Sequence, residues 1–312
     1  MRLVFCGTPA FAVPTLNALL AAGHTVTLVL TQPDRASGRG MLHQASAVKQ
    51  AALEHNLSIA QPEKIRNNPE LQQQLTAIAA DAIIVVAYGR IIPPWMLILP
   101  RLGNLNLHAS LLPKYRGAAP IQWAIARGEL ETGVTTMRLD EGLDTGDMLL
   151  QRSVPIEPEQ TSAELFPALA ELGARLMIET LAGLEKGTLI ATPQDDSFAT
   201  LAPILQREDG HMDCAMTARE LYNRWRGFQP WPGAYGFFRE MKFTVHRMCL
   251  AAAPAQTSAQ PGTLLSLDHR LWLACGKETW VELLEVQLEG KKRISATDFL
   301  HGHRLSSGER LA

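Results

Sequence analysis

Short apolar runs alternate with amphipathic stretches along the first half of the chain. The runs LVFCG, VTLVL and AIIVVA are separated by segments such as PTLNALLAAG, in which apolar residues recur every three or four positions. This rhythm is typical of strands that alternate with helices, so it predicts a Rossmann-like, mostly parallel sheet with helices on both faces. Ligands of such sheets bind beyond the carboxyl ends of the strands, and a functional site is expected there.

The pattern changes toward the C-terminus. Residues 188–210 mix Pro, Asp, Ser and Thr without clear periodicity, which is typical of a linker. After a short helical segment, several brief apolar or alternating runs follow, separated by turn residues, and they predict a smaller C-terminal β-barrel of the oligonucleotide-binding (OB) type. We therefore expect an N-terminal domain over 1–187, a linker over 188–210 and a C-terminal domain over 211–312.

Composition narrows the class of protein. The 312 residues are 46% hydrophobic and 19% charged, as in an ordinary folded protein. Four scattered cysteines without a CxxC pair indicate reduced thiols, and the absence of an apolar run of about 18 residues argues against a membrane span. The net charge of −2 is unevenly divided, because residues 211–312 carry 13 basic and 10 acidic side chains whereas residues 1–210 carry 16 and 21. A cytoplasmic protein is expected, with only a weak basic bias in its C-terminal part.

The stretch NLNLHASLLPKYRG at 104–117 holds the clearest candidate chemistry. Side chains alternate along a strand, so Asn106 and His108 share one face while Leu105 and Leu107 occupy the other. An imidazole can accept a proton near neutral pH, and a carboxamide can donate to an oxyanion. A purely structural, hydrogen-bonded histidine remains the alternative from these residues alone.

An acidic turn, DEGLDTGD at 140–147, supplies the best-placed carboxylate. Asp144 lies between glycines after a strand of the same sheet, where its carboxylate could orient the imidazole of His108. A turn-forming Asp with no further role is the alternative, since Asp-Gly clusters are common in loops. With no Ser or Cys nucleophile beside them, Asn, His and Asp favour direct attack of a substrate amine on an activated acyl group.

The N-x-H pair, the following SLLPKYRG and the downstream D-x-G-x-D-x-G-D together resemble the folate-dependent formyltransferases. The resemblance implies that Asn106, His108 and Asp144 form the catalytic trio, that 10-formyltetrahydrofolate is the formyl donor and that no metal takes part. It also implies a catalytic role for the N-terminal domain. The SLLP stretch would line the folate site with Ser110, Leu111, Leu112 and Pro113.

The resemblance continues through FCGTPAFAVPTL, TQPDRASGRG, FQPWPGAY and GKKRISATDFLHGHRL, which span nearly the whole chain. It is similar to the branch of the family that formylates the methionine of initiator methionyl-tRNA for translation initiation. A stand-alone glycinamide ribonucleotide transformylase would share Asn106, His108 and Asp144 but would end near the linker, whereas about a hundred residues remain here. The implied partners are folate and this tRNA, bound partly by the C-terminal domain. We expect a monomer without membrane association.

Two basic segments are candidates for tRNA contact. The resemblance implies that Arg39, in the loop after the second strand, reaches the acceptor end of the tRNA, although Met41 and Leu42 stand where the family has cations. Three consecutive basic residues nearer the C-terminus could each neutralise a phosphate, or form only a solvated hairpin. These are Lys291, Lys292 and Arg293.

Two other functions stay open. One is formyl transfer to a small amine, or hydrolysis of formyltetrahydrofolate, with the second domain serving assembly. The other is a non-catalytic RNA-binding protein that has kept the fold, against which the intact Asn106, His108 and Asp144 argue.

Overall fold

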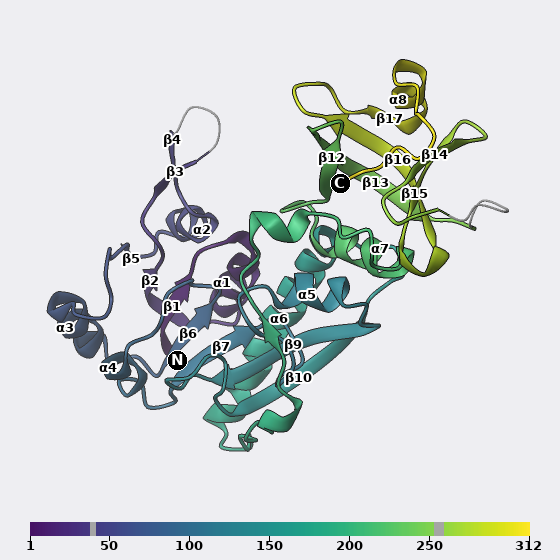
Figure 1. Cartoon of the computed structure of the whole chain (residues 1–312). Helices are drawn as coiled ribbons and strands as arrows, with labels where there is room; N and C mark the ends of the chain where they lie inside the picture. Colours follow the sequence, from purple (N-terminus) through teal and green to yellow (C-terminus); the bar gives the residue numbers. More distant parts are fainter. Residues whose placement is uncertain (38–41, 253–258) are drawn as a thin grey trace. The chain divides into compact units, whose positions relative to one another are not determined.

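The computed structural model describes residues 1–37, 42–252 and 259–312 (Figure 1). The chain packs as two units, and each is described by itself. Unit 1 comprises Met1–Pro120, Glu131–Pro155 and Leu165–Pro203. Unit 2 comprises Ile121–Leu130, Ile156–Glu164 and Ile204–Ala312, so two short segments from the first half of the chain belong to it.

A seven-stranded sheet forms the centre of unit 1, in the order β10-β9-β7-β6-β1-β2-β5. Neighbouring strands from β5 to β7 are parallel, whereas β9 runs against both β7 and β10. The predicted mostly parallel sheet is confirmed. Its strands are β1 (Arg2–Gly7), β2 (Thr25–Leu30), β5 (Ile59–Ala60), β6 (Ala82–Val86), β7 (Asn104–His108), β9 (Glu131–Arg138) and β10 (Met148–Pro155).

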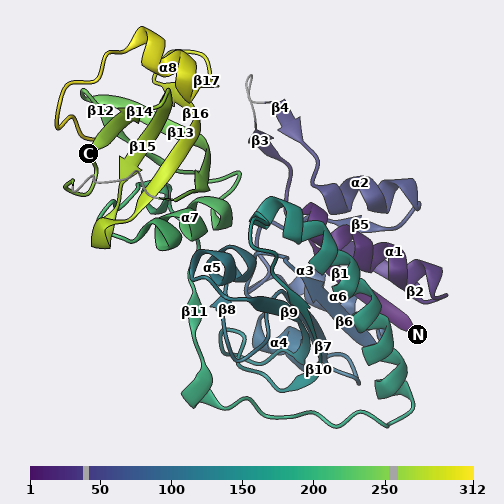
Figure 2. The ribbon, with the colours of Figure 1, turned by 90° about the vertical axis from the view of Figure 1, so that its right-hand side faces the viewer.

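Helices cover both faces of this sheet. On one face, buried residues of β1, β2 and β6 pack with α3 (Pro69–Ile78) and α4 (Pro94–Leu97). On the other face, Leu107 of β7 meets α6 (Ser162–Glu185) at Gly173, where a Cβ would lie 2.5 Å from the Leu107 Cδ2 atom. Only glycine allows so close an approach, and α6 lies along the sheet there (Figure 2).

The remaining elements of unit 1 connect or extend the sheet. They are a 3-10 turn (Ala10–Ala12), α1 (Val13–Ala21), β3 (Arg35–Ser37), β4 (Leu42–Gln44), α2 (Ala47–Glu54), β8 (Arg116–Gly117), a 3-10 turn (Asp196–Phe198) and β11 (Leu201–Ala202). β3 pairs with β4, and β8 pairs with β11 in parallel. Within the described ranges, no helix combines the length and apolar character needed to cross a membrane.

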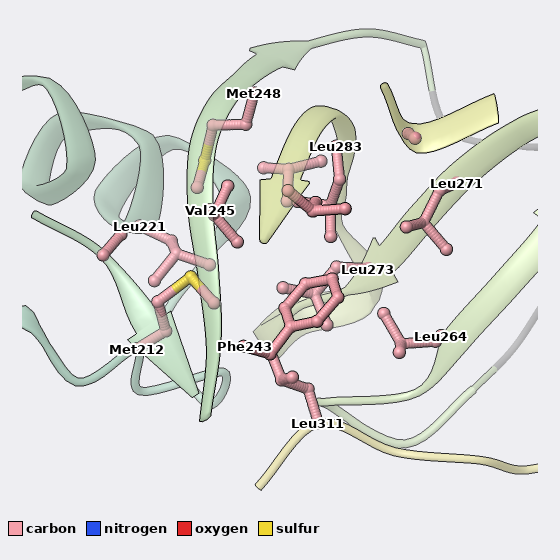
Figure 3. Packing of buried hydrophobic residues seen from close by; sticks show 14 of the residues in the cluster. Met212, Leu221, Phe243, Val245, Met248, Leu264, Leu271, Leu273, Leu283 and Leu311 are labelled. Atoms are coloured by element: carbon pink, nitrogen blue, oxygen red, sulfur yellow. The ribbon is translucent and has the colours of Figure 1, made fainter. Parts of the chain in front are cut away.

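Unit 2 is built on a six-stranded antiparallel sheet that curls into a half-barrel, which confirms the predicted smaller C-terminal barrel. Its apolar side chains face inward, where Phe243, Leu273 and Leu283 lie close together (Figure 3). Helix α7 (Ala218–Gly227) begins at a capping box, in which Thr217 and Glu220 satisfy each other's backbone N–H groups, and packs on this core through Leu221.

The strands of the half-barrel follow α7 along the chain. They are β12 (Tyr235–Phe238), β13 (Met241–Leu250), β14 (Leu264–Leu267), β15 (Arg270–Ala274), β16 (Trp280–Leu288) and β17 (Ile294–Ser295). The other elements of unit 2 are α5 (Pro120–Ala126, from Ile121 on), two 3-10 turns (Arg207–Gly210 and Gly276–Glu278) and α8 (Ala296–Gly302). Trp123 of α5 contacts Phe228 edge to face, with ring centroids 5.2 Å apart, which ties the segment 121–130 to this unit.

Candidate active site

Strand β7 presents Asn104, Asn106 and His108 on one face. The hydrogen bonds around the two asparagines show that the first has a structural role and that the second is free to contact a ligand. The amide of Asn104 is 2% exposed and donates to the carbonyls of Met96 (2.9 Å) and Leu97 (3.1 Å), so it ties α4 to the sheet. Asn106 is 8% exposed, and its side chain makes no hydrogen bond within the described part of the chain. The amide of Asn106 can therefore donate to a ligand.

His108 ends β7, and each of its ring nitrogens faces an oxygen. Nε2 lies 2.8 Å from the carbonyl oxygen of Tyr115, and because a carbonyl only accepts, Nε2 carries the proton of the neutral ring. Nδ1 lies 3.6 Å from Oδ2 of Asp144, which is longer than a hydrogen bond. Nδ1 is thus the nitrogen that can accept a proton, and the carboxylate beside it stabilises the positive charge that results.

Asp140 and Asp144 both lie in the turn between β9 and β10, but their carboxylates make different contacts. Asp140 closes the turn, since its carboxylate accepts from the hydroxyl of Thr145 at 2.8 Å. Asp144 has a φ of +53°, a left-handed conformation that Asp tolerates better than most residues. Its Oδ2 accepts from the backbone N–H of Gly117 at 2.9 Å and faces His108. The carboxylate of Asp144 is therefore directed at the imidazole and does not close its own turn.

The SLLP stretch forms a loop held from inside by polar contacts. The Ser110 hydroxyl donates to the Lys114 carbonyl at 2.6 Å, and the N–H of Leu112 donates to the Thr135 hydroxyl at 3.2 Å. Ser110 and Leu112 are buried, whereas the other two members of the stretch, Leu111 and Pro113, are half-buried. Ser110 and Leu112 thus shape the loop, and Leu111 and Pro113 keep part of their surface exposed.

The segment 194–202 runs along the site, although its sequence has the composition of a linker. β11 pairs with β8, and the Thr200 hydroxyl accepts from the N–H of Tyr115 at 2.9 Å. Gln194 donates to the backbone carbonyls of Asp144 and Gly146, both at 2.8 Å. Sequence reasoning missed these residues, because isolated polar side chains in a segment without periodicity carry no local signal.

Two side chains near the carboxyl ends of β1 and β6 lack the reactivity for covalent chemistry. Cys6 is fully buried in β1, and burial raises the pKa of its thiol far above the usual range. Tyr88, which follows β6, is 1% exposed, and burial likewise raises the pKa of its phenol. Both groups stay neutral near pH 7, and the Cys6 thiol is not a thiolate nucleophile.

The predicted tRNA contacts are described only in part. Arg39 and Met41 lie outside the described residues, and Leu42 begins β4. The basic run of Lys291, Lys292 and Arg293 forms the exposed turn between β16 and β17. Within it, Arg293 pairs with Glu285, which also pairs with Arg247 at 3.1 Å.

Comparison with known proteins identifies the family. A family model described as formyl transferase matches residues 1–181, and the model of the formyl transferase C-terminal domain matches residues 204–304. This chain belongs to the formyl transferase family. A methionyl-tRNA formyltransferase of Acidobacterium capsulatum is 65% identical over 311 residues, which cover 100% of this chain and 99% of the relative. A methionyl-tRNA formyltransferase of Koribacter versatilis is 59% identical, over 100% of this chain and 98% of the relative.

A solved structure shares the fold of this formyl transferase. The crystal structure of HypX from Aquifex aeolicus in complex with tetrahydrofolic acid superposes with a TM-score of 0.62. The aligned part covers 96% of this chain and 47% of HypX, at 18% sequence identity. At that identity, the similarity shows a common fold.

Proposed function

We propose that this formyl transferase transfers the formyl group of 10-formyltetrahydrofolate to the amino group of methionine on initiator methionyl-tRNA, in the cytoplasm and as a monomer. The observation that carries the proposal is the full-length match to methionyl-tRNA formyltransferases at 65% and 59% identity. The match includes the C-terminal domain, which the family model places at residues 204–304.

The geometry supports one division of labour among the three side chains. Bound 10-formyltetrahydrofolate supplies the formyl carbon that the methionine amine attacks. The amide of Asn106 donates to the formyl oxygen as negative charge develops on it. His108 accepts the amine proton at Nδ1 and returns it to N10 of the donor as the bond between N10 and the formyl carbon breaks, so that tetrahydrofolate leaves. Between these two transfers Asp144, with Oδ2 at 3.6 Å, stabilises the imidazolium. Asp144 acts through His108.

The residues around the trio fit a folate. An aromatic ring system needs apolar surface with a few polar groups that orient it. Leu111 and Pro113 are half-buried, and Leu143, directly before Asp144, is 63% exposed. We propose that the SLLP loop binds the donor through Leu111 and Pro113, while buried Ser110 and Leu112 keep the loop in shape.

The tRNA contacts are proposed on charge. Lys291 and Lys292 are exposed, and no described residue forms an ion pair with either of them. Their charges are available to phosphates, each phosphate contact releasing about one counterion. Arg293 contributes less, because it pairs with Glu285, a carboxylate that it shares with Arg247. Arg39 remains a proposed contact on the resemblance alone.

The test combines purified protein, 10-formyltetrahydrofolate and initiator tRNA charged with radiolabelled methionine. We expect formylmethionyl-tRNA and tetrahydrofolate in equal amounts, and neither product with His108→Ala. Formyltetrahydrofolate consumed equally fast without tRNA would indicate a hydrolase. Consumption only with a small free amine would indicate another acceptor, and tRNA binding without consumption would indicate a non-catalytic RNA-binding protein.

A further inference from the structure

We propose that Gln194 and Arg116 are a positioning pair that holds the carboxylate of Asp144 at its distance from His108. The inference rests on the proposed function, because it concerns the same reaction. It assigns a role to a segment of unit 1 whose composition predicts only a linker.

The carboxamide of Gln194 spans the turn that carries Asp144. Its Nε2 donates to the carbonyls of Asp144 and Gly146, both at 2.8 Å, so both amide hydrogens are used on either side of Thr145. Asp144 has a φ of +53°, which L side chains adopt at a cost. Hydrogen bonds from outside the turn offset that cost and fix where the Asp144 side chain begins.

Arg116 determines how the Gln194 amide is oriented. The carboxamide oxygen accepts from Nε of Arg116 at 3.0 Å and from Nη2 at 2.9 Å. Because guanidinium groups only donate, the amide oxygen must face Arg116 and the NH2 group must face the two carbonyls. Arg116 is 7% exposed, and its remaining partner among the described residues is Asp196, at 2.7 Å from Nη2. Loss of Gln194 would leave donors of a buried guanidinium without a partner.

The backbone on both sides of Arg116 closes the connection to the catalytic groups. Tyr115 accepts from Nε2 of His108 through its carbonyl at 2.8 Å, and Gly117 donates its N–H to Oδ2 of Asp144 at 2.9 Å. Residues 115–117 thus hold the imidazole and the carboxylate, and the Arg116 side chain joins them to Gln194. A change at Gln194 therefore alters the separation between Asp144 and His108, which is 3.6 Å here.

The test compares Gln194→Met and Gln194→Glu with a matched control, Asp196→Asn. Methionine keeps the length of the side chain but removes every hydrogen bond. Glutamate can still accept from Arg116, but it places an oxygen against the carbonyls of Asp144 and Gly146. Asp196 pairs with the same Arg116 but is 82% exposed, and exposed ion pairs contribute little.

We expect both Gln194 variants to lower kcat about 10- to 100-fold, the scale of a small misplacement at a reaction centre, with KM for tRNA and folate within about twofold. Asp196→Asn should stay within about twofold in kcat. The ring 15N signals of His108, assigned with His108→Ala in histidine-labelled protein, should shift in the Gln194 variants and not in Asp196→Asn.

A kcat within about threefold of the unmodified enzyme in both Gln194 variants would overturn the proposal. So would a loss of kcat that merely follows the folded fraction, or one that leaves the His108 signals unchanged. The NMR comparison needs no substrate. If the unmodified protein failed to formylate methionyl-tRNA, the proposed function would fall, while the signals of His108 would still decide whether Gln194 positions the site.

Discussion

Replacing Asp144 with asparagine removes one charge beside His108 and little else. The amide has the same size as the carboxylate. Its oxygen can still accept from the N–H of Gly117, which in the unmodified protein donates to Oδ2 of Asp144 at 2.9 Å. The left-handed φ of +53° also suits asparagine. We therefore expect a folded protein with nearly unchanged thermal stability and a lower turnover number.

The magnitude follows from the 3.6 Å between Nδ1 of His108 and Oδ2 of Asp144. Two unit charges at that separation interact by about 4.6 kcal/mol at an effective dielectric constant of 20 and by about 1.2 kcal/mol in water. The two side chains are 6% and 15% exposed, so the true value lies between these limits. Because about 1.4 kcal/mol corresponds to a tenfold change in rate, kcat should fall roughly 10- to 1,000-fold.

The assay is single-turnover formylation of methionyl-tRNA with saturating 10-formyltetrahydrofolate, which isolates the chemical step from product release. Glu141→Gln is the matched control, since it removes one charge from an exposed position of the same turn. We expect the control to keep the rate of the unmodified enzyme. A rate for Asp144→Asn as high as that of Glu141→Gln would refute the assigned role of the carboxylate.

Three further predictions follow from the same structure. Asn106→Ala should lower kcat about 100- to 1,000-fold with little loss of stability. Asn104→Ala breaks two hydrogen bonds of a buried amide and should cost about 1–3 kcal/mol in urea unfolding; the reverse pattern would contradict the assignment. Gly117→Ala should destabilise more than Gly103→Ala, because its φ is +122° and its Cβ would lie 2.6 Å from the Ala202 oxygen, while Gly103, at φ +87°, has open space; equal unfolding midpoints would disprove this. Lys292→Ala should reduce the log-log salt slope of tRNA binding by about 0.9 and Arg293→Ala by less, since Glu285 pairs with Arg293; an unchanged slope for Lys292→Ala would exclude a phosphate contact there.

Local sequence patterns are enough to predict the architecture of each unit and to single out two residues of the candidate site. Side chains repeat every two residues in a strand and every 3.6 in a helix, so the apolar pattern alone separates β7 from α6. The same period of two places Asn106 and His108 on one face. The resemblance to formyltransferases adds Asp144, which no periodic pattern would single out.

Only the tertiary structure separates roles that look alike along the chain. Asn104 and Asn106 lie on the same face of one strand. The side-chain amide of Asn104 donates to the carbonyls of Met96 and Leu97, whereas that of Asn106 can donate to a ligand. In the acidic turn, the carboxylate of Asp140 accepts from the hydroxyl of Thr145, whereas the carboxylate of Asp144 faces His108. These differences depend on neighbours that are distant in sequence, and composition does not record them.

The sequence by itself predicts the longer strands and helices, because their periodicity is carried by residues close together along the chain, but not the two-residue strands β8 and β11. It does not determine that Gln194 meets Arg116, 78 residues earlier, or that Trp123 packs on Phe228 in unit 2. Such contacts involve single side chains and short backbone pairs without periodicity. They form only when packing of the apolar faces has brought distant segments together, and at the candidate site they fix where the carboxylate of Asp144 lies.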